Sequence, residues 1–202
     1  MIDIADLPNS PSCERNKEVI LEKLQSYFSN SKNVLEIGGG TGQHAHHFAL
    51  SMPHLHWQTT DRSSYLGDLA ARVKFAALAN LPQPLELDVN NPWTSPERLF
   101  DTVFSANTLH IMGWHEVVIM LSWLPTILTP KARIAFYGPF NYGGNFTSES
   151  NRIFDSSLKQ NPGEMGIRDF ESLETLMNQQ EFRLFQDCEM PANNRLLIWD
   201  RS

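Results

Sequence analysis

The chain is poor in cysteine, in basic residues and in long apolar runs. It has two cysteines, Cys13 and Cys188, in 202 residues, and two thiols can form neither a disulfide framework nor a four-cysteine zinc site. Lysine and arginine number 16 against 23 acidic residues, a formal net charge of -7, which argues against non-specific binding to nucleic acid or anionic lipid. We therefore expect a reducing, cytoplasmic setting and no nucleic-acid partner.

Membrane and leader signals are also missing from the sequence. No apolar run approaches the length of about 18 residues that a spanning helix needs, and the most apolar stretch, residues 117–128, is interrupted by Ser122 and Pro125. The first six residues include two acids and lack a basic segment followed by an apolar one. We expect no contact with a membrane, and we find no linker that would divide residues 1–202 into several domains.

Apolar runs that predict strands alternate along the chain with amphipathic runs that predict helices. The predicted strands are 33–37, 56–61, 85–89, 102–107, 133–137, 182–189 and 195–200, and the predicted helices are 12–28, 43–50, 65–79, 114–124, 148–159 and 169–179. Pro130 and Lys131 predict a turn before the fifth strand. The last two strands are joined by residues 190–194, short enough to demand an antiparallel hairpin. The predicted fold is α/β, a Rossmann-like doubly wound seven-stranded sheet, mostly parallel, with an antiparallel C-terminal hairpin strand.

The strongest local motif follows the first predicted strand. The run from Glu36 to Gly42 reads E-I-G-G-G-T-G, in which a strand enters, glycines allow a tight turn, and a helix leaves with unpaired N–H groups. A diphosphate loop has the spacing G-x-G-x-x-G, but Gln43 occupies the third glycine position. Glu36 would repel a diphosphate and would suit a ligand with an ammonium group. This pattern favours S-adenosylmethionine over NAD, and the open alternative is a glycine turn with no ligand.

Two further acids lie where predicted strands end, which is the edge at which open α/β sheets bind ligands. Asp61 could accept hydrogen bonds from both ribose hydroxyls, or it could merely cap the next helix. Asp88 could accept from an adenine amino group while Val89 packs near the ring, or it could only form the turn before Asn90. Together with the glycines, these residues complete a predicted cofactor site: Glu36, Gly38, Gly39, Gly40, Gly42, Asp61, Arg62, Asp88, Val89 and Asn107.

These motifs resemble those of class I, seven-β-strand, S-adenosylmethionine-dependent methyltransferases. The chain is more closely similar to a family of methyltransferase-like proteins of unknown function, whose motifs appear at residues 10–17, 36–45, 105–111, 137–140 and 190–195. The resemblance covers roughly residues 10–199 and implies S-adenosylmethionine as cofactor and methyl transfer as reaction. It implies no particular acceptor. It also places Asn107, after the fourth strand, beside the methionine part of the cofactor.

Candidate chemistry lies on the same predicted edge. His110 follows Asn107, titrates near neutrality in its ordinary state, and is the predicted proton acceptor; an ordinary loop histidine is the alternative. Tyr137 is the second predicted catalytic residue. A substrate collar is predicted from residues on the segments around this edge: Arg15, Asn16, Phe140, Asn193, Asn194 and Arg195. The leading helix, within residues 10–30, is expected to cover the cofactor, and residues 138–168 form a short insertion on the substrate edge.

Other functions are less well supported. Histidines cluster between His44 and His56, but no acid or cysteine completes a ligand set at recognisable spacing, so we predict no metal site. No N-P-P-aromatic run follows the fourth strand and no Pro-Cys nucleophile is present, which argues against nucleic-acid substrates. Because arginine suits planar anions, we predict a small polar or acidic acceptor. The alternative is a non-catalytic module that binds S-adenosylmethionine or S-adenosylhomocysteine and acts through a partner.

Overall fold

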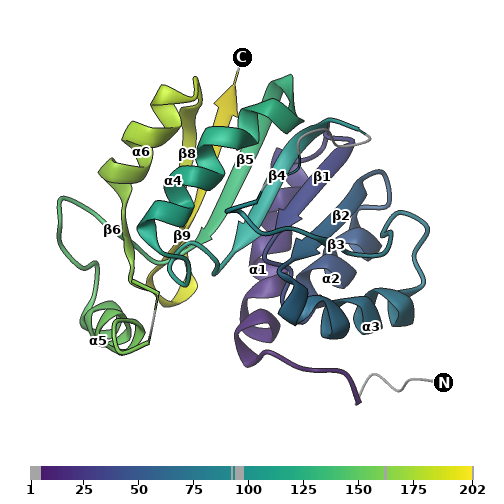
Figure 1. Cartoon of the computed structure of the whole chain (residues 1–202), viewed down its shortest axis with the longest axis horizontal. Coiled ribbons are helices and arrows are strands. Elements are labelled where there is room, and N and C mark those ends of the chain that lie inside the picture. The colour runs from purple at the N-terminus through teal and green to yellow at the C-terminus, as the bar shows by residue number, and fades with distance from the viewer. Residues whose placement is uncertain (1–5, 92, 94–97, 162, 202) are drawn as a thin grey trace. The chain divides into compact units, whose positions relative to one another are not determined.

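The computed structural model describes residues 6–91, 93, 98–161 and 163–201. Seven strands form one sheet (Figure 1). Their order is β3 (Leu85–Glu86), β2 (His56–Asp61), β1 (Asn33–Ile37), β4 (Phe100–Ala106), β5 (Leu128–Gly138), β9 (Asn194–Arg201) and β8 (Arg183–Met190). A separate two-stranded sheet pairs β6 (Phe140–Asn141) with β7 (Arg168–Asp169).

Strand directions confirm the predicted fold class. β1 pairs in parallel with both β2 and β4, and β2 pairs in parallel with β3. β9 runs antiparallel to β5 and to β8. β8 and β5 therefore point the same way, with the antiparallel hairpin strand β9 inserted between them. The sheet is a mostly parallel, Rossmann-like α/β sheet with an antiparallel C-terminal strand.

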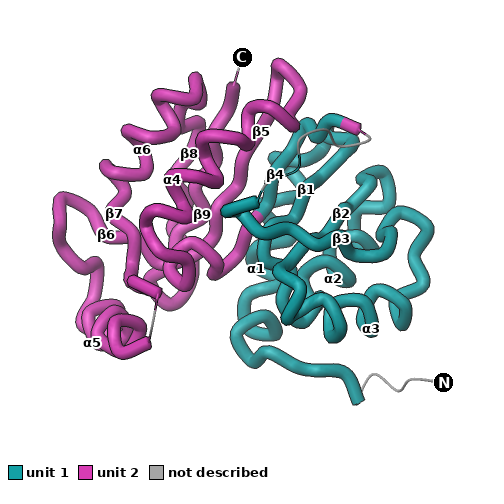
Figure 2. The backbone as a smooth tube through the Cα atoms, viewed as in Figure 1, with its two compact units in different colours: residues 1–93, 99–104 teal, residues 94–98, 105–202 magenta. Residues whose placement is uncertain are grey.

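The backbone divides into two compact units, residues 1–93 with 99–104, and residues 94–98 with 105–202 (Figure 2). The helices of the first unit are α1 (Pro11–Tyr27), α2 (Gln43–Ser51), the short 3-10 turn η2 (Ser63–Tyr65) and α3 (Leu66–Ala76). α1 begins where Ser10 Oγ accepts the backbone N–H of Cys13 at 3.5 Å and proline occupies the first turn.

An aromatic cluster forms the core of the first unit. Phe28, Phe48, Trp57 and Phe104 have no exposed surface, and the ring of Phe48 lies 5.5 Å from that of Trp57 and 5.4 Å from that of Phe104. Phe28 is the C-cap residue of α1, and the other three rings come from α2, β2 and β4. Burying so much aromatic surface stabilises the packing of α2 and of the C-terminal end of α1 on the strands.

The second unit contains the remaining helices: α4 (Trp114–Trp123), η3 (Leu124–Ile127), α5 (Glu149–Leu158), α6 (Phe170–Gln179) and η4 (Pro191–Asn193). α4 and α6 lie side by side (Figure 1). α6 begins within one residue of the predicted start at 169. Asp169 is its N-cap, with Oδ1 accepting the N–H of Ser172 at 3.3 Å, and its buried stripe includes Leu173 and Met177.

The register of the hairpin brings three strand ends to one edge of the second unit. Arg195 of β9 lies opposite Gly138 of β5 and opposite Glu189 of β8.

The predicted turn at Pro130–Lys131 is wrong, because β5 already begins at Leu128. The ladder between β5 and β9 runs only from Ala132 to Gly138, so Pro130 needs no N–H for it. None of the helices in residues 6–91, 98–161 and 163–201 combines the length and the apolar character of a membrane span.

Candidate functional site

The glycine loop of the first unit is built as a tight turn between β1 and α2. Gly38, Gly40 and Gly42 have φ values of 77°, 54° and 73°, the left-handed region that glycine adopts without strain. The N–H groups of Gly38 and Gly39 donate to the carbonyl of Thr60 at 3.1 and 2.9 Å, which fixes the loop against β2. A Cβ built on Gly40 meets no atom within 4 Å, so the backbone there is open to an approaching ligand.

Gly39 is required for a different reason, namely lack of space. A Cβ at this position would lie 2.2 Å from Thr59 Oγ1 and 3.1 Å from the side chain of Leu69. Thr59 is fully buried, and its hydroxyl lies close enough to the carboxyl of Glu36 to oppose the effect of burial on the pKa of that group. The loop therefore passes directly over β2 and α3, and a side chain at Gly39 would push it away from both.

Asp61 ends β2 and holds the loop. Its Oδ2 accepts the N–H of Gly40 at 2.7 Å, and its Oδ1 accepts the N–H of Arg62 at 2.7 Å. Burial raises the pKa of Asp61 above its usual value, while the two N–H groups act in the opposite direction. A carboxylate has about four lone-pair sites, so these two bonds leave capacity for two hydroxyl donors.

The segment with Asp88 lies next to the end of β2, since the N–H of Leu87 donates to the carbonyl of Asp61 at 2.9 Å. Asp88 Oδ1 accepts the N–H of Asn90 at 2.9 Å, so this side chain does form the turn that the sequence offered as the alternative. Val89 is buried at 5% exposure. The structure thus brings Asp61, Asp88 and Val89 into one neighbourhood, while β3 itself ends at Glu86.

Glu36 lies inside the first unit at 2% exposure. Its Oε2 accepts the indole N–H of Trp57 at 3.1 Å, which ties the carboxyl to the aromatic core. Burial raises the pKa of Glu36 from 4.5 to about 7, and the charge of nearby Asp61 acts in the same direction. An ammonium group that approached this carboxyl would favour its ionised form, so Glu36 would release a proton when a cationic ligand binds. The pairing of Glu36 with such a ligand stays a prediction.

Gln43 organises the start of the chain, a role that the sequence reading missed. Its Oε1 accepts the N–H of Ser10 at 2.5 Å and the hydroxyl of Thr41 at 2.8 Å. Its Nε2 donates to Asn9 Oδ1 and to Glu14 Oε1, each at 2.5 Å. The amide at the position of the missing third glycine therefore binds the N-terminal segment to the glycine loop.

Arg72 of α3 strengthens the same connection. Its Nε donates to the carbonyl of Thr41 at 2.9 Å and its Nη2 donates to the carbonyl of Pro8. The only sequence signal for Arg72 and Gln43 was a pair of polar residues in helices next to the loop. The bonds of Arg72 go to backbone carbonyls, and the partners of Gln43 include Asn9 and Glu14, which are about 30 residues away in the chain, so nothing in the residue pattern identified these partners.

The two predicted substrate residues of α1 have different environments. Asn16 is 7% exposed, and its Oδ1 lies 2.7 Å from His44 Nε2. Burial lowers the pKa of His44 to about 4, so a neutral imidazole donates to this amide and the pair joins α1 to α2. Arg15 is exposed and contacts Ser12 Oγ at 3.5 Å, which leaves its charge in solvent.

In the second unit, the predicted catalytic residues gather after β4. Asn107 has a φ of 57°, and its N–H donates to the carbonyl of Tyr137 at 2.8 Å. A Cβ built on Gly138 would lie 3.7 Å from His110 Nδ1 and 3.8 Å from Asn107 Oδ1. Asn107, His110 and the end of β5 are therefore neighbours, as the sequence predicts.

His110 is a buried, neutral histidine. It is 6% exposed, and its ring contacts Phe154 with the centroids 5.3 Å apart. Burial lowers its pKa to about 4, and the positive charge of Arg168 acts in the same direction. At neutral pH the ring can accept a hydrogen bond, but it is a weaker base than an exposed histidine. Tyr137 and Phe140 are also buried, at 3% and 1% exposure.

The predicted substrate residues of the hairpin have partners within the protein. Asn193 O accepts from Asn151 Nδ2 at 3.2 Å, and Asn194 Nδ2 donates to the carbonyl of Pro191 at 3.1 Å, so both asparagines shape the turn.

Arg195 is similarly engaged. It donates to Asp187 Oδ1 at 2.7 Å and lies 3.2 Å from Glu189. Its guanidinium also lies 5.7 Å from the ring centroid of Tyr142. Its charge is thus satisfied by β8 rather than free for a ligand. No group of three or more His, Cys, Asp or Glu side chains among the described residues could hold a metal ion.

Comparison with solved structures identifies the class of fold. The chain is similar to the mitomycin 7-O-methyltransferase MmcR (TM-score 0.75, 18% identity, covering 91% of this chain and 54% of that one). It is also similar to an O-methyltransferase family protein from Burkholderia thailandensis (0.81, 13%, 94% and 57%) and to human N-acetylserotonin methyltransferase in complex with SAM (0.79, 15%, 95% and 53%). The chain spans little more than half the length of each, and at these identities the likeness concerns the fold.

The fold is therefore that of S-adenosylmethionine-dependent methyltransferases, with a loop at β1 that lacks the diphosphate pattern. Residues 7–201 match the family described as a protein of unknown function (DUF938). The chain belongs to this family.

Proposed function

We propose that this protein is an S-adenosylmethionine-dependent methyltransferase that acts on a small molecule. The observation that carries the proposal is the glycine loop: its backbone is open at Gly40, and the carboxylate that receives the Gly40 N–H, Asp61, retains sites for hydroxyl donors. Gln43 fills the position where a diphosphate loop needs glycine. The methyltransferase folds of the solved relatives support the same conclusion.

In the proposed cofactor site, each group has a stated role. The turn at Gly40 lets the ligand approach the backbone, the start of α2 supplies backbone N–H groups, Asp61 accepts the ribose hydroxyls, and Glu36 provides negative charge for the ammonium group. Val89 offers an apolar surface for the adenine, and Asp88 an acceptor for its amino group. When bound, S-adenosylmethionine supplies an electrophilic methyl group on a sulfonium centre. The proposed position of α1 over the cofactor is supported by the bonds from Gln43 to the N-terminal segment.

For the acceptor, we propose that Asn107 and His110 orient a polar group. A neutral His110 can accept a hydrogen bond from a hydroxyl or an amine, and it takes up a proton only as the nucleophile becomes acidic during transfer. Arg195 gives no support to an acidic acceptor, since Asp187 and Glu189 already satisfy its charge. Arg15 is the exposed cation among the predicted substrate residues, and it belongs to the first unit. A polar, uncharged acceptor therefore fits the residues of the second unit better than an acidic one.

Calorimetric titration with S-adenosylmethionine, S-adenosylhomocysteine and NAD tests the cofactor. We expect binding of at least one of the first two and none of NAD. Asp61→Ala should lower the affinity at least about tenfold, because a carboxylate that accepts from hydroxyls contributes roughly 1.5–3 kcal/mol. Asp68→Ala, an exposed acid on α3, is the matched control. NAD binding, or equal affinity of Asp61→Ala and wild type, would refute the assignment.

Turnover separates the enzyme from a non-catalytic binding module. Once an acceptor is found, His110→Gln and Tyr137→Phe should lower the rate of methyl transfer while the affinity for S-adenosylhomocysteine stays unchanged. Cofactor binding without turnover on any member of a broad panel of small-molecule acceptors would instead support the binding module.

A further inference from the structure

The segment that follows β4 carries His110 and is held in place by donors from another part of the chain. Leu109, His110 and Met112 are buried, and buried carbonyl groups need hydrogen-bond donors within the protein. Inside the segment, the carbonyl of Thr108 accepts the N–H groups of Ile111 and Met112 at 3.0 and 3.2 Å. This turn sets the local shape of the segment, but it does not supply donors to the carbonyls that follow.

These donors come from Arg168 and from a residue shortly before it. Arg168 Nε donates to the carbonyl of Leu109 at 2.9 Å, and its Nη2 donates to the carbonyl of Met112. The N–H of Gly166 donates to the carbonyl of His110 at 2.9 Å. The backbone before, at and after His110 is therefore held by one short segment that lies 56 to 59 residues further along the chain.

That short segment is itself anchored in the second unit. β7 begins at Arg168 and pairs with β6, which places Arg168 opposite Phe140. The N–H of Ile167 donates to Asp155 Oδ1 at 2.8 Å. Asp155 belongs to α5, is 3% exposed, and lies 2.6 Å from Lys159 Nζ. Arg168 thus extends from a fixed backbone toward the segment that carries His110.

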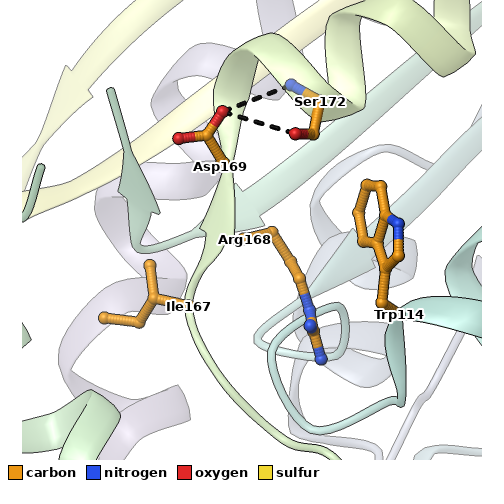
Figure 3. Close-up of a pocket in the computed structure, with 5 residues that line it drawn as sticks. All are labelled: Trp114, Ile167, Arg168, Asp169 and Ser172. Atoms are coloured by element: carbon orange, nitrogen blue, oxygen red, sulfur yellow. Dashed lines mark hydrogen bonds between the residues drawn. The ribbon is translucent and has the colours of Figure 1, made fainter. Parts of the chain in front are cut away.

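The side chain of Arg168 has one direction available. It extends from β7 past Trp114, whereas the next residue, Asp169, points the other way and accepts from Ser172 (Figure 3). The guanidinium carbon lies 6.0 Å from the ring centroid of Trp114, and Arg168 is 9% exposed. Two donors on one rigid plane reach two carbonyl groups at once, which the single ammonium of a lysine does not reproduce.

Arg168 also acts on the ring of His110 through its charge. Burial lowers the pKa of His110 to about 4, and the positive charge of Arg168 acts in the same direction. Three acids of the surrounding segments, Asp155, Glu164 and Glu116, attract Arg168 and stabilise its charge. Arg168 therefore favours the neutral imidazole, which is the form that can accept a hydrogen bond.

We propose that Arg168 is a positioning residue, which fixes the backbone around His110 so that its imidazole faces the methyl acceptor. The use of His110 in methyl transfer rests on the proposed function, whereas the positioning of His110 by Arg168 does not. Without the forked donors, the carbonyls of Leu109 and Met112 would lose their partners. The segment would then open locally and admit water to the ring, while the sheet of the second unit stays folded.

NMR of full-length Arg168→Lys tests the proposal, because this variant keeps the charge and removes the fork. We expect the amide of Gly166 to exchange with solvent at least about tenfold faster than in wild type, and by a larger factor than the amide of Ile198 in β9, which reports global opening. The titration midpoint of His110 should rise by at least about one pH unit as water reaches the ring. Arg152→Lys, at an exposed position of α5, is the matched control and should change neither quantity.

Three outcomes would overturn the proposal. They are wild-type exchange at Gly166, equal acceleration at Gly166 and Ile198, and an unshifted midpoint for His110; the second and third are what a merely structural role of Arg168 would give. If Arg168→Lys does not fold, the wild-type protein still decides. The Nε–H of Arg168 should exchange at least about tenfold more slowly than that of the exposed Arg152, and equal rates would overturn the proposal.

These measurements need neither cofactor nor methyl acceptor, so they separate the positioning from the proposed function. A His110→Gln variant that transfers methyl groups at the wild-type rate would refute the role of His110 in the reaction and leave the NMR results as they are. Wild-type behaviour of Arg168→Lys in the NMR experiments would refute the positioning, whether or not methyl transfer is observed.

Discussion

The ionisation of Glu36 gives a direct test of how deeply this carboxyl of the proposed cofactor site is buried. Glu36 is 2% exposed and its pKa is raised to about 7 from 4.5. Below pH 4.5 the carboxyl is protonated in both folded and unfolded chains, and its contribution to stability is greatest. As pH rises to 7, the unfolded chain loses this proton while the folded chain keeps it, so the free energy of unfolding falls. Above about pH 7 the carboxyl is ionised in both folded and unfolded chains, and its contribution to stability is lost.

The magnitude follows from the size of this rise. Each tenfold change in an acid constant is worth about 1.4 kcal/mol, so the buried charge costs about 3 kcal/mol above pH 7. Glu36→Gln keeps an acceptor for the indole N–H of Trp57 and carries no charge. We expect the stability of the variant relative to wild type to increase by about 3 kcal/mol between pH 4.5 and pH 8.

Urea unfolding at a series of pH values measures this difference. Subtracting the free energy of unfolding of wild type from that of Glu36→Gln at each pH cancels the contributions of other titrating groups, such as His110. Glu22→Gln, an exposed acid of α1, is the control and should differ from wild type by the same small amount at every pH. A difference between Glu36→Gln and wild type that does not change with pH would refute the reasoning about burial.

Three further predictions concern other parts of the structure. Gly39→Ala should lower the free energy of unfolding by about 1–3 kcal/mol in urea titrations, because Thr59 beneath it leaves no room for a methyl group. Gly67→Ala is the control and should cause no such loss, since a Cβ there meets nothing within 4 Å. Equal losses in the two variants would contradict the close contact between Gly39 and Thr59. The imidazole of His110 should titrate near pH 4 in NMR spectra assigned with His110→Gln, whereas a midpoint near 6.5 would mean that the ring is solvated. Arg195→Met should cost about 1–3 kcal/mol in thermal or urea unfolding, since it leaves the carboxylate of Asp187 without its charged partner; an unchanged stability would show that this pair is solvent-screened.

Calorimetry can also connect Glu36 to the ligand. If the ammonium group of S-adenosylmethionine lies near this carboxyl, binding should release a proton near pH 6.5, because the positive charge favours the ionised form. Titrations in buffers with different ionisation enthalpies detect the proton. Binding without proton release would place the ammonium group elsewhere and leave Glu36 as a partner of Trp57 alone.

Local patterns in the sequence determined the fold class. The alternation of apolar and amphipathic runs, the short connection before β9 and the cap Asp169 depend on neighbours within a few residues of each other. The glycine spacing between Gly38 and Gly42 likewise predicted a turn whose φ values the structure confirms. Such features can be predicted from the sequence because backbone sterics and the spacing of apolar residues depend on residue type and order.

Tertiary structure alone decided which polar groups are free and which are already used. Arg195 is paired with Asp187, Gln43 binds the N-terminal segment, and Arg168 donates to the backbone carbonyls of Leu109, Met112 and Glu164. In sequence these residues look like any other exposed polar side chains, since their partners are distant in the chain or are backbone carbonyls. The charge state of Glu36 and His110 also depends on burial, and burial arises only when strands and helices pack together and exclude water.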